Sequence, residues 1–203
     1  MFPTLSEKVR KAIEMAPSGI ATLDVLESLR LCGPHTLKTT LSRLKKKGAI
    51  AGLKRGTYAA LPLADGFASA LATFNGYLGF SSALYLHRVT AEQPFTITLI
   101  TSSTSATKSF GQYEFKAVAL KEKAIGFEYK GILAVSTRAK TLFDCLYFPQ
   151  ASVERGKLLE AYGNAKLSRS EWREFEDYVK RFATGKTADR IRKAKQEILG
   201  WKA

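Results

Sequence analysis

The segment Thr36–Leu61, TLKTTLSRLKKKGAIAGLKRGTYAAL, holds seven Lys or Arg side chains and no Asp or Glu. Lysine and arginine bind phosphate oxygens, and duplex DNA carries one negative charge about every 1.7 Å along its axis. A surface that carries these cations and no carboxylate can neutralise phosphates, because it has no negative charge of its own to repel them. The chemistry that this segment is suited to is therefore the binding of a polyanion.

The charge of the whole chain agrees with such a partner. The 203 residues include 32 Lys and Arg against 18 Asp and Glu, which gives a formal net charge of +14. Residues 1–61 carry 11 basic and 4 acidic side chains, and no acid lies between Glu27 and Asp65. Residues 151–203 interleave both signs, so we expect a solvated or partner-facing surface there. Nucleic acid is the first expected partner, and an anionic membrane surface is the second.

Few other residues have the types or spacing that catalysis or metal binding requires. The two histidines, His35 and His87, are too few for most Ser–His–Asp and metal-hydrolase sites. Cys32 and Cys145 are far apart, lack a CxxC spacing and have apolar neighbours, so we expect small buried thiols in a reducing compartment. Phosphate-binding glycine loops are missing as well. We therefore expect no metal and no cofactor.

One pattern, Glu114-x-Lys116 within YEFKAV, matches the trailing half of a metal-dependent nuclease signature. The leading Asp of that signature is missing, and the nearest upstream acid, Glu92, lies in a loop before a separate strand. An exposed strand with alternating side chains accounts for the pattern better. We expect that the protein is not an enzyme, and a nuclease that uses Glu114 and Lys116 is the enzymatic alternative. His87, beside leucines on a helix, is expected to be a hydrogen-bonded packing residue.

The basic segment is predicted to lie on the third of three helices and on a hairpin. The first helix begins with Thr4 and Glu7 at capping-box spacing. The second has Thr22 or Asp24 as its N-cap and ends before the helix-breaking CGPH. The third begins at Pro34 and ends at Gly48.

The third helix has one apolar side, formed by Leu37, Leu41 and Leu44 at i, i+4 and i+7. At 100° per residue, the opposite side and its flanks carry hydrogen-bond donors and no carboxylate. After the helix, two short apolar runs flank Lys54, Arg55 and Gly56, which predicts a β-hairpin with a basic tip. Three helices followed by such a hairpin form the winged-helix plan. The polar and basic residues of the helix are His35, Thr36, Lys38, Thr39, Ser42, Arg43, Lys45, Lys46 and Lys47.

Two sets of these side chains are predicted to have different roles in DNA binding. Base discrimination needs short polar side chains or arginine near the beginning of the helix, and His35, Thr36, Thr39 and Arg43 are the available types. The second set, Lys45, Lys46, Lys47, Lys54 and Arg55, is predicted to position the protein on phosphates. The alternative is that lysines in the last helical turn only complement the helix dipole and stay in water.

Residues 1–62 are thus predicted to form a winged helix-turn-helix domain, and residues 63–203 a mixed α/β domain with a small sheet and C-terminal helices. The fold class is α+β. Strands are expected in PFTITLIT, YEFKAVAL, IGFEYKGIL and LAVS, with a polar loop over SSTSATKS. The predicted helix N-caps are Ser81 or Ser82, Ser136 or Thr137, Ser152, Ser168 (with Glu171 in a capping box) and Thr187, and Gly163 is a predicted C-terminal stop. No apolar run approaches the roughly 18–20 residues that span a bilayer, and no signal peptide is evident, so we expect a soluble, cytoplasmic protein without a membrane partner.

Three blocks of the sequence resemble the family of AbiEi-type antitoxins and related transcriptional regulators of bacteria and archaea. They are LKRGTYAALP, GYLGFSSALYLHRVT and ILAVSTRAKTLFDCLYFP, and they occur in the order that the family has, across about residues 20–150. The Ser-Ala-Leu…His helix and the Ala-Lys-Thr-Leu-Phe-Asp helix are the more specific pieces. The residues that match, Ser82, Ala83, Leu84, His87, Lys140, Leu142 and Asp144, form no catalytic set, and we interpret them as structural.

The resemblance implies an N-terminal domain that binds double-stranded DNA at inverted repeats and represses its own operon. It also implies a C-terminal domain that counteracts a nucleotidyltransferase toxin, without a stable complex between the two proteins. The C-terminal helices do not match the family. A stand-alone winged-helix transcription factor with a ligand-sensing or oligomerisation domain is the alternative to an antitoxin.

Overall fold

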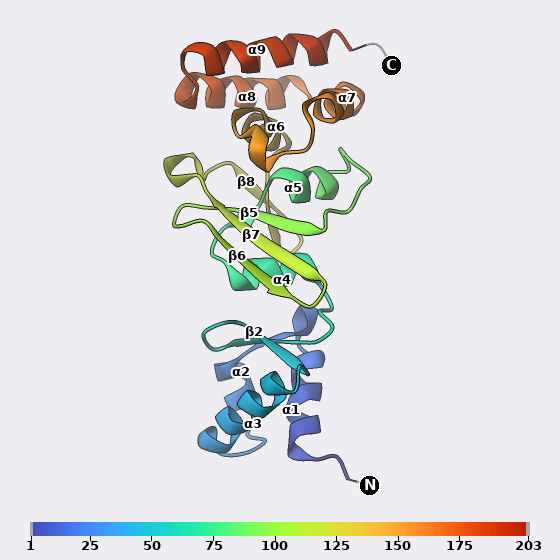
Figure 1. Ribbon diagram of the computed structural model, residues 1–203, viewed down its shortest axis with the longest axis vertical. Helices are drawn as coiled ribbons and strands as arrows, with labels where there is room; N and C mark the ends of the chain where they lie inside the picture. Colours follow the sequence, from blue (N-terminus) through green and yellow to red (C-terminus); the bar gives the residue numbers. More distant parts are fainter. Residues whose placement is uncertain (1, 202–203) are drawn as a thin grey trace. The chain divides into compact units, whose positions relative to one another are not determined.

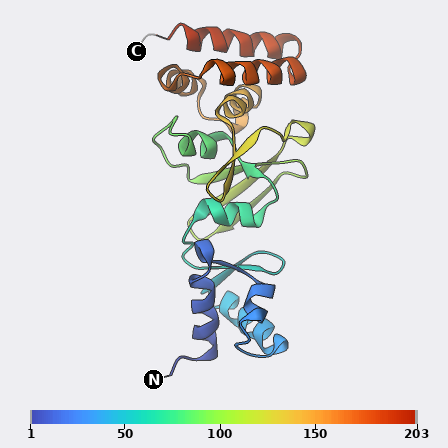
Figure 2. The same cartoon turned by 180° about the vertical axis from the view of Figure 1, so that it is seen from behind.

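The computed structural model describes residues 2–201 and has the expected α+β fold. Its internal contacts divide the chain into two compact units. The first runs to Asn75 and takes in Thr107–Phe115, and the second holds Gly76–Ala106 and the chain from Lys116 onward. Figure 1 shows the helices and strands of both units, and Figure 2 shows them from behind.

The first unit has the element order of a winged helix. The Thr4–Glu7 capping box opens its first helix, as predicted, with Thr4 N–H donating to Glu7 Oε2 at 2.6 Å. The second helix begins after Thr22, whose hydroxyl accepts from Val25 N–H at 3.3 Å. The elements are α1 (Leu5–Glu14), β1 (Ile20–Thr22), α2 (Leu23–Ser28), α3 (Pro34–Lys46), β2 (Ile50–Lys54), β3 (Thr57–Ala60) and α4 (Gly66–Thr73), with a 3-10 turn at Pro17–Gly19.

A small antiparallel sheet, in the order β1-β3-β2, completes this unit. Strand β1 was not predicted from the sequence, because three residues are too few to show an alternating pattern. It pairs with β3 through Ile20 and Ala59, and β2 pairs with β3 through Ile50 and Ala60. The buried core joins the three helices to the sheet, and it includes Val9, Ile13, Leu26, Leu37, Leu41, Leu44 and Ile50.

The boundary between the two units differs from the predicted one after residue 62. The short connection from β3 leads into α4, which packs against β2 of the first unit. Lys108, from a distant part of the chain, also belongs to this unit, and its Nζ donates to the Leu53 carbonyl oxygen at 3.1 Å. Local composition cannot reveal that Thr107–Phe115 belongs to the first unit, because that segment joins the unit only through contacts with residues far away in the sequence.

The remaining strands form one six-stranded sheet in the order β6-β7-β5-β4-β9-β8. Strands β6 and β8 are its edges. Part of the expected polar loop SSTSATKS is the strand β6, which shows no apolar alternation because its side chains are mostly exposed. The strands are β4 (Tyr77–Leu78), β5 (Thr96–Thr101), β6 (Ala106–Phe110), β7 (Tyr113–Ala119), β8 (Phe127–Lys130) and β9 (Leu133–Ser136).

The helices of the second unit are α5 (Phe80–Leu86), α6 (Arg138–Tyr147), α7 (Arg155–Ala165), α8 (Arg169–Phe182) and α9 (Gly185–Leu199). Short 3-10 turns lie at Lys121–Lys123 and Pro149–Ala151. Helices α8 and α9 run side by side in both views (Figure 1, Figure 2). Two predicted caps are confirmed: the Thr137 hydroxyl accepts from Lys140 N–H, and Ser168 forms a capping box with Glu171.

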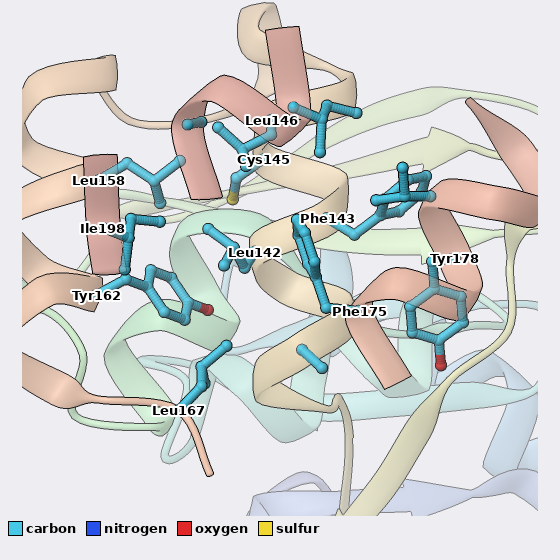
Figure 3. Packing of buried hydrophobic residues seen from close by; sticks show 14 of the residues in the cluster. Leu142, Phe143, Cys145, Leu146, Leu158, Tyr162, Leu167, Phe175, Tyr178 and Ile198 are labelled. Atoms are coloured by element: carbon cyan, nitrogen blue, oxygen red, sulfur yellow. The ribbon is translucent and has the colours of Figure 1, made fainter. Parts of the chain in front are cut away.

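Helix α6 lies at the centre of the apolar core of the second unit (Figure 3). Leu142, Phe143, Cys145 and Leu146 point from it into the cluster, where α7, α8 and α9 cover them. The neighbouring helices contribute Leu158, Tyr162, Phe175, Tyr178, Val179 and Ile198. Because eight consecutive residues of α6, Ala139–Leu146, are buried, this helix has no solvent-facing stripe over most of its length.

Several predicted caps of the second unit are wrong, because the helices begin or end at other residues. Ser82 lies inside α5, whose N-cap is Gly79, and its buried hydroxyl accepts from Thr98 N–H at 2.8 Å. Ser152 does not cap α7, which begins after Glu154. Gly163 lies within that helix, closely covered by Trp201. Thr187 lies in the first turn of α9, whose N-cap is Thr184.

Candidate nucleic-acid interface

Helix α3 is held by its leucines and presents its other side to solvent. Gly33 is its N-cap and Pro34 occupies its first turn, where the missing N–H of proline costs no helical hydrogen bond. Leu37, Leu41 and Leu44 are buried in the core of the first unit, as predicted. Because the buried side chains recur at helical spacing, the intervening ones are directed away from the core.

The predicted DNA-binding residues are almost all exposed. Thr39 is the exception, since it is half-buried and its hydroxyl donates to the His35 carbonyl oxygen at 3.1 Å. That bond leaves the Thr39 oxygen able to accept from a base but not to donate to one. The exposed members are His35, Thr36, Lys38, Ser42, Arg43, Lys45, Lys46, Lys47, Lys54 and Arg55.

Six of these residues line one shallow hollow along α3, with a volume of about 410 Å³. They are His35, Lys38, Thr39, Ser42, Arg43 and Lys46. The structure therefore brings together the short polar residues near the beginning of the helix and three cations on a single face. We call this surface the α3 face. Lys45 is not part of it, because its side chain extends toward Gly52 of β2.

The hairpin tip lies next to the α3 face within the same unit. Strands β2 and β3 are joined at Arg55 and Gly56, and Gly56 has the positive φ of 72° that this turn requires. The Gly56 carbonyl oxygen accepts from Leu23 N–H at 2.7 Å, which ties the tip to the beginning of α2. A second hollow, about 430 Å³ in volume, includes both Arg55 and Lys38 in its lining. Lys38 therefore links the tip to the α3 face.

One carboxylate near these cations was missed in the sequence analysis. Asp24, in the first turn of α2, lines the second hollow together with Lys38 and Arg55. It lies just upstream of the acid-free segment, so counting along the chain does not reveal it. Over residues 2–201, neither Asp24 nor any cation of the α3 face or the tip takes part in an ion pair within 4 Å. No carboxylate of the described residues therefore neutralises these cations by direct contact.

The other candidate residues are dispersed. Burial raises the pKa of the Cys145 thiol to about 12, and Cys32 is half-buried. His87 caps the end of α5, and its Nε2 lies 2.6 Å from the Ser136 carbonyl oxygen, while burial lowers the pKa of its imidazole. Glu114 and Lys116 are exposed on β7.

Residues 2–201 contain no cluster of three or more His, Cys, Asp or Glu side chains with metal-binding geometry. None of the helices in this range combines the length and the apolar character needed to cross a membrane.

No protein-family model and no curated protein matches this chain. Among solved structures, it is similar to one described as the crystal structure of RV2827C protein from Mycobacterium tuberculosis, with a TM-score of 0.64 and 15% sequence identity. The match covers 98% of this chain and 78% of that chain. At this identity the likeness shows the fold alone: the chain shares its α+β architecture with that protein.

Proposed function

We propose that this protein is a DNA-binding transcriptional repressor that acts as the antitoxin of a toxin–antitoxin system. It would repress its own operon at an operator with inverted repeats and counteract a nucleotidyltransferase toxin. The observation that carries the DNA-binding half is the α3 face, where six of the predicted residues lie on one exposed surface with unpaired cations. A protein of this kind acts in the cytoplasm, where the DNA is.

The dimensions of α3 suit the major groove. Its 13 residues correspond to a length of about 20 Å, and a helix fits the groove of B-DNA, which is about 12 Å wide. Of the residues predicted to read bases, His35, Thr39 and Arg43 belong to the α3 face and would reach base edges. Lys38 and Lys46 on the helix, and Lys54 and Arg55 at the tip, would contact phosphates on either side.

The antitoxin half rests on the resemblance of the two later sequence blocks to the AbiEi-type family. The matching residues make internal contacts, as expected of a structural signature: Ser82 accepts from Thr98 N–H, and Lys140 pairs with Asp144. The antitoxin would act without a stable complex with the toxin.

Gel shifts with the DNA upstream of the gene, over a series of salt concentrations, test the DNA-binding half. Arg43→Ala should weaken binding and relax sequence preference, because an arginine in the groove contacts bases. Lys54→Ala with Arg55→Ala should weaken binding to all sequences and flatten the salt dependence by about two units, one for each lost phosphate contact.

Lys186→Ala with Lys193→Ala is the matched control, because it removes two positive charges from α9 of the other unit. The control should bind like the parent protein. If the Arg43 and Lys54/Arg55 variants also bound like the parent, the α3 face and the tip would not be the DNA-binding surface. For the antitoxin half, co-expression of the full chain with an adjacent nucleotidyltransferase gene should rescue growth.

A second candidate is a stand-alone regulator whose second unit binds a ligand. It is favoured by the cleft between the loop Val89–Phe95 and α7, which has a volume of about 780 Å³. Its lining combines apolar side chains such as Val153 and Phe95 with polar ones such as Asn164 and Glu160. The two candidates differ in a simple observation, since only the antitoxin requires a nucleotidyltransferase gene beside its own.

A further inference from the structure

Strand β8 is an unpaired edge that exposes apolar side chains. It pairs with β9 on one side and ends the six-stranded sheet on the other. Phe127, Tyr129 and Ile132, at or beside this edge, are 47%, 72% and 71% exposed. Edge strands of soluble proteins are usually shielded, because their free N–H and C=O groups pair readily with another strand. An exposed aromatic edge therefore indicates a surface that another strand covers.

The hydrogen-bond pattern of the β8–β9 hairpin shows which backbone groups of β8 are free. Gly131 and Ile132 form its two-residue turn, so Lys130 and Leu133 beside the turn form a hydrogen-bonded pair. Such pairs alternate along an antiparallel ladder. Gly126 follows this alternation, since its carbonyl oxygen accepts from Thr137 N–H at 3.0 Å.

The backbone N–H and C=O groups of Phe127 and Tyr129 therefore point away from β9. Over residues 2–201, no hydrogen bond to these groups from outside the hairpin is present. They are the groups with which an added strand would pair.

Strand β8 carries one negative and one positive side chain, Glu128 and Lys130, which could pair with those of a second β8 strand. Glu128 and Lys130 lie on one face of the strand, and Phe127 and Tyr129 on the other. Both charged side chains are exposed, and neither forms an ion pair within the described residues. Lys130 Nζ makes one long hydrogen bond, of 3.3 Å, to the Leu86 carbonyl oxygen, and an ammonium group has two further protons to donate.

We infer that this edge is a homodimer interface in which two β8 strands pair antiparallel about a two-fold axis. A perpendicular two-fold axis places a residue opposite its own copy. With Tyr129 opposite Tyr129 of the second copy, both exchange their outward-facing backbone hydrogen bonds. Glu128 then faces Lys130 of the second copy, twice, in the non-hydrogen-bonded pairs where side chains approach most closely. The backbone pairing of the two sheets is centred on this Tyr129 pair, because Phe127 then lies opposite Gly131 of the turn.

The neighbouring symmetric arrangements are disfavoured. A two-fold axis at residue 128 places two glutamates opposite each other, and an axis at residue 130 places two lysines opposite each other. Like charges directly across a ladder are destabilising. An axis at residue 127 leaves both charges without a partner across the interface. The alternation of Glu128 and Lys130 therefore selects one register. The inference does not depend on the proposed function.

Two charge reversals test the interface, because each alone repels its own copy and the two together attract. Glu128→Lys alone places lysines opposite lysines, and Lys130→Glu alone places glutamates opposite glutamates. A mixture of the two variants restores both Glu–Lys pairs in the heterodimer. The double variant, with both changes in one chain, also keeps them. Sedimentation of the full chain over a concentration series measures the dimer in each case.

We expect the parent and the double variant to dimerise. The dimer dissociation constant of each single variant should be at least about tenfold higher, because two cross-strand pairs change from attraction to repulsion. The equimolar mixture of the single variants should recover the parent dimer. Asp177→Lys and Lys180→Glu, on the exposed side of α8, are the matched controls and should leave the dimer unchanged.

A monomeric parent protein at every concentration would overturn the inference. So would single variants that dimerise like the parent, or a mixture that stays monomeric. Because a misfolded variant could not regain a dimer on mixing, recovery in the mixture also excludes loss of folding as the cause.

Discussion

The buried ion pair between Lys140 and Asp144 allows a sharp prediction about stability. Both side chains lie on α6 and are fully buried, and Lys140 Nζ lies 2.5 Å from each carboxylate oxygen of Asp144. The rings of Phe143 and Tyr178 lie 5.8 and 5.7 Å from the same nitrogen. Burial raises the pKa of Asp144 to about 6 and lowers the pKa of Lys140. Each charge is therefore tolerated in this core mainly because of the other.

Removal of one partner should be much more harmful than removal of both. Asp144→Leu leaves an ammonium group among aromatic rings, and breaking a buried pair in this way costs about 3–5 kcal/mol. Lys140→Met leaves an unpaired carboxylate and should cost a similar amount at neutral pH. Lys140→Met with Asp144→Leu replaces both charges by apolar side chains of similar size, which is typically neutral or stabilising by about 1–4 kcal/mol. The expected coupling energy is therefore at least about 6 kcal/mol, since two single costs of about 3 kcal/mol or more would vanish in the double variant.

The stability cost of Lys140→Met should depend on pH in a defined direction. The folded-state pKa of Asp144 is raised from its usual 3.8 to about 6, so the folded state favours the protonated carboxyl. Without Lys140 to oppose it, burial raises this pKa further. The cost of Lys140→Met should therefore be large near pH 7 and shrink as the pH falls through about 6, because the carboxyl then becomes protonated in the folded parent as well as in the folded variant.

Urea unfolding, followed by circular dichroism for the parent, both single variants and the double variant, gives the coupling energy from a double-mutant cycle. The reasoning would be refuted by single variants that each lose less than about 1 kcal/mol and add up in the double variant, because the pair would then not be a coupled buried unit. A Lys140→Met variant that became relatively less stable on acidification would refute it as well.

Two further predictions concern the second unit. Gly76→Ala should destabilise it by more than about 2 kcal/mol, because a Cβ there would collide with the Ile100 carbonyl oxygen of β5. In the control Gly156→Ala, in α7, the new Cβ meets only Glu154 Oε1 at 3.8 Å, and the variant should be more stable than the parent by up to about 1 kcal/mol. Equal urea midpoints for the two variants would contradict this prediction. Burial lowers the pKa of His87, so the folded state resists its protonation and the stability that it contributes is lost as the pH falls below about 6.5. The stability difference between the parent and His87→Gln should therefore narrow on acidification, and a widening difference would show that the imidazole charges readily in the fold.

Features fixed by contacts within about one helical turn were predicted well from the sequence. The capping boxes at Thr4–Glu7 and Ser168–Glu171 are formed by residues three apart, so their spacing alone identifies them. The same holds for α3, where the leucine spacing determined which side is buried and therefore which polar residues form the α3 face. Two residues depart from the prediction: the Thr39 hydroxyl bonds to its own helix, and the Lys45 side chain extends toward Gly52.

Features that depend on a distant partner were missed. Ser82 has the type and position of an N-cap, but its hydroxyl instead accepts a hydrogen bond from Thr98 N–H of β5. Asp24 approaches the hairpin tip because β1 and β3 pair and bring α2 with them. Lys108 reaches Leu53 across 55 positions of the chain. None of these contacts has a periodic signal, because each joins elements whose pairing is settled only by the fold.

The pair on α6 illustrates the difference most clearly. A lysine and an aspartate at i and i+4 are typical of an exposed helix surface, where the pair contributes only a few tenths of a kcal/mol. Here α8 and the other C-terminal helices cover α6, so the same spacing produces a buried pair with a much larger expected energy. The charges are local in sequence, but their burial is not. Spacing therefore predicts which charged groups can meet, and only the packing of other elements determines how much their meeting contributes to stability.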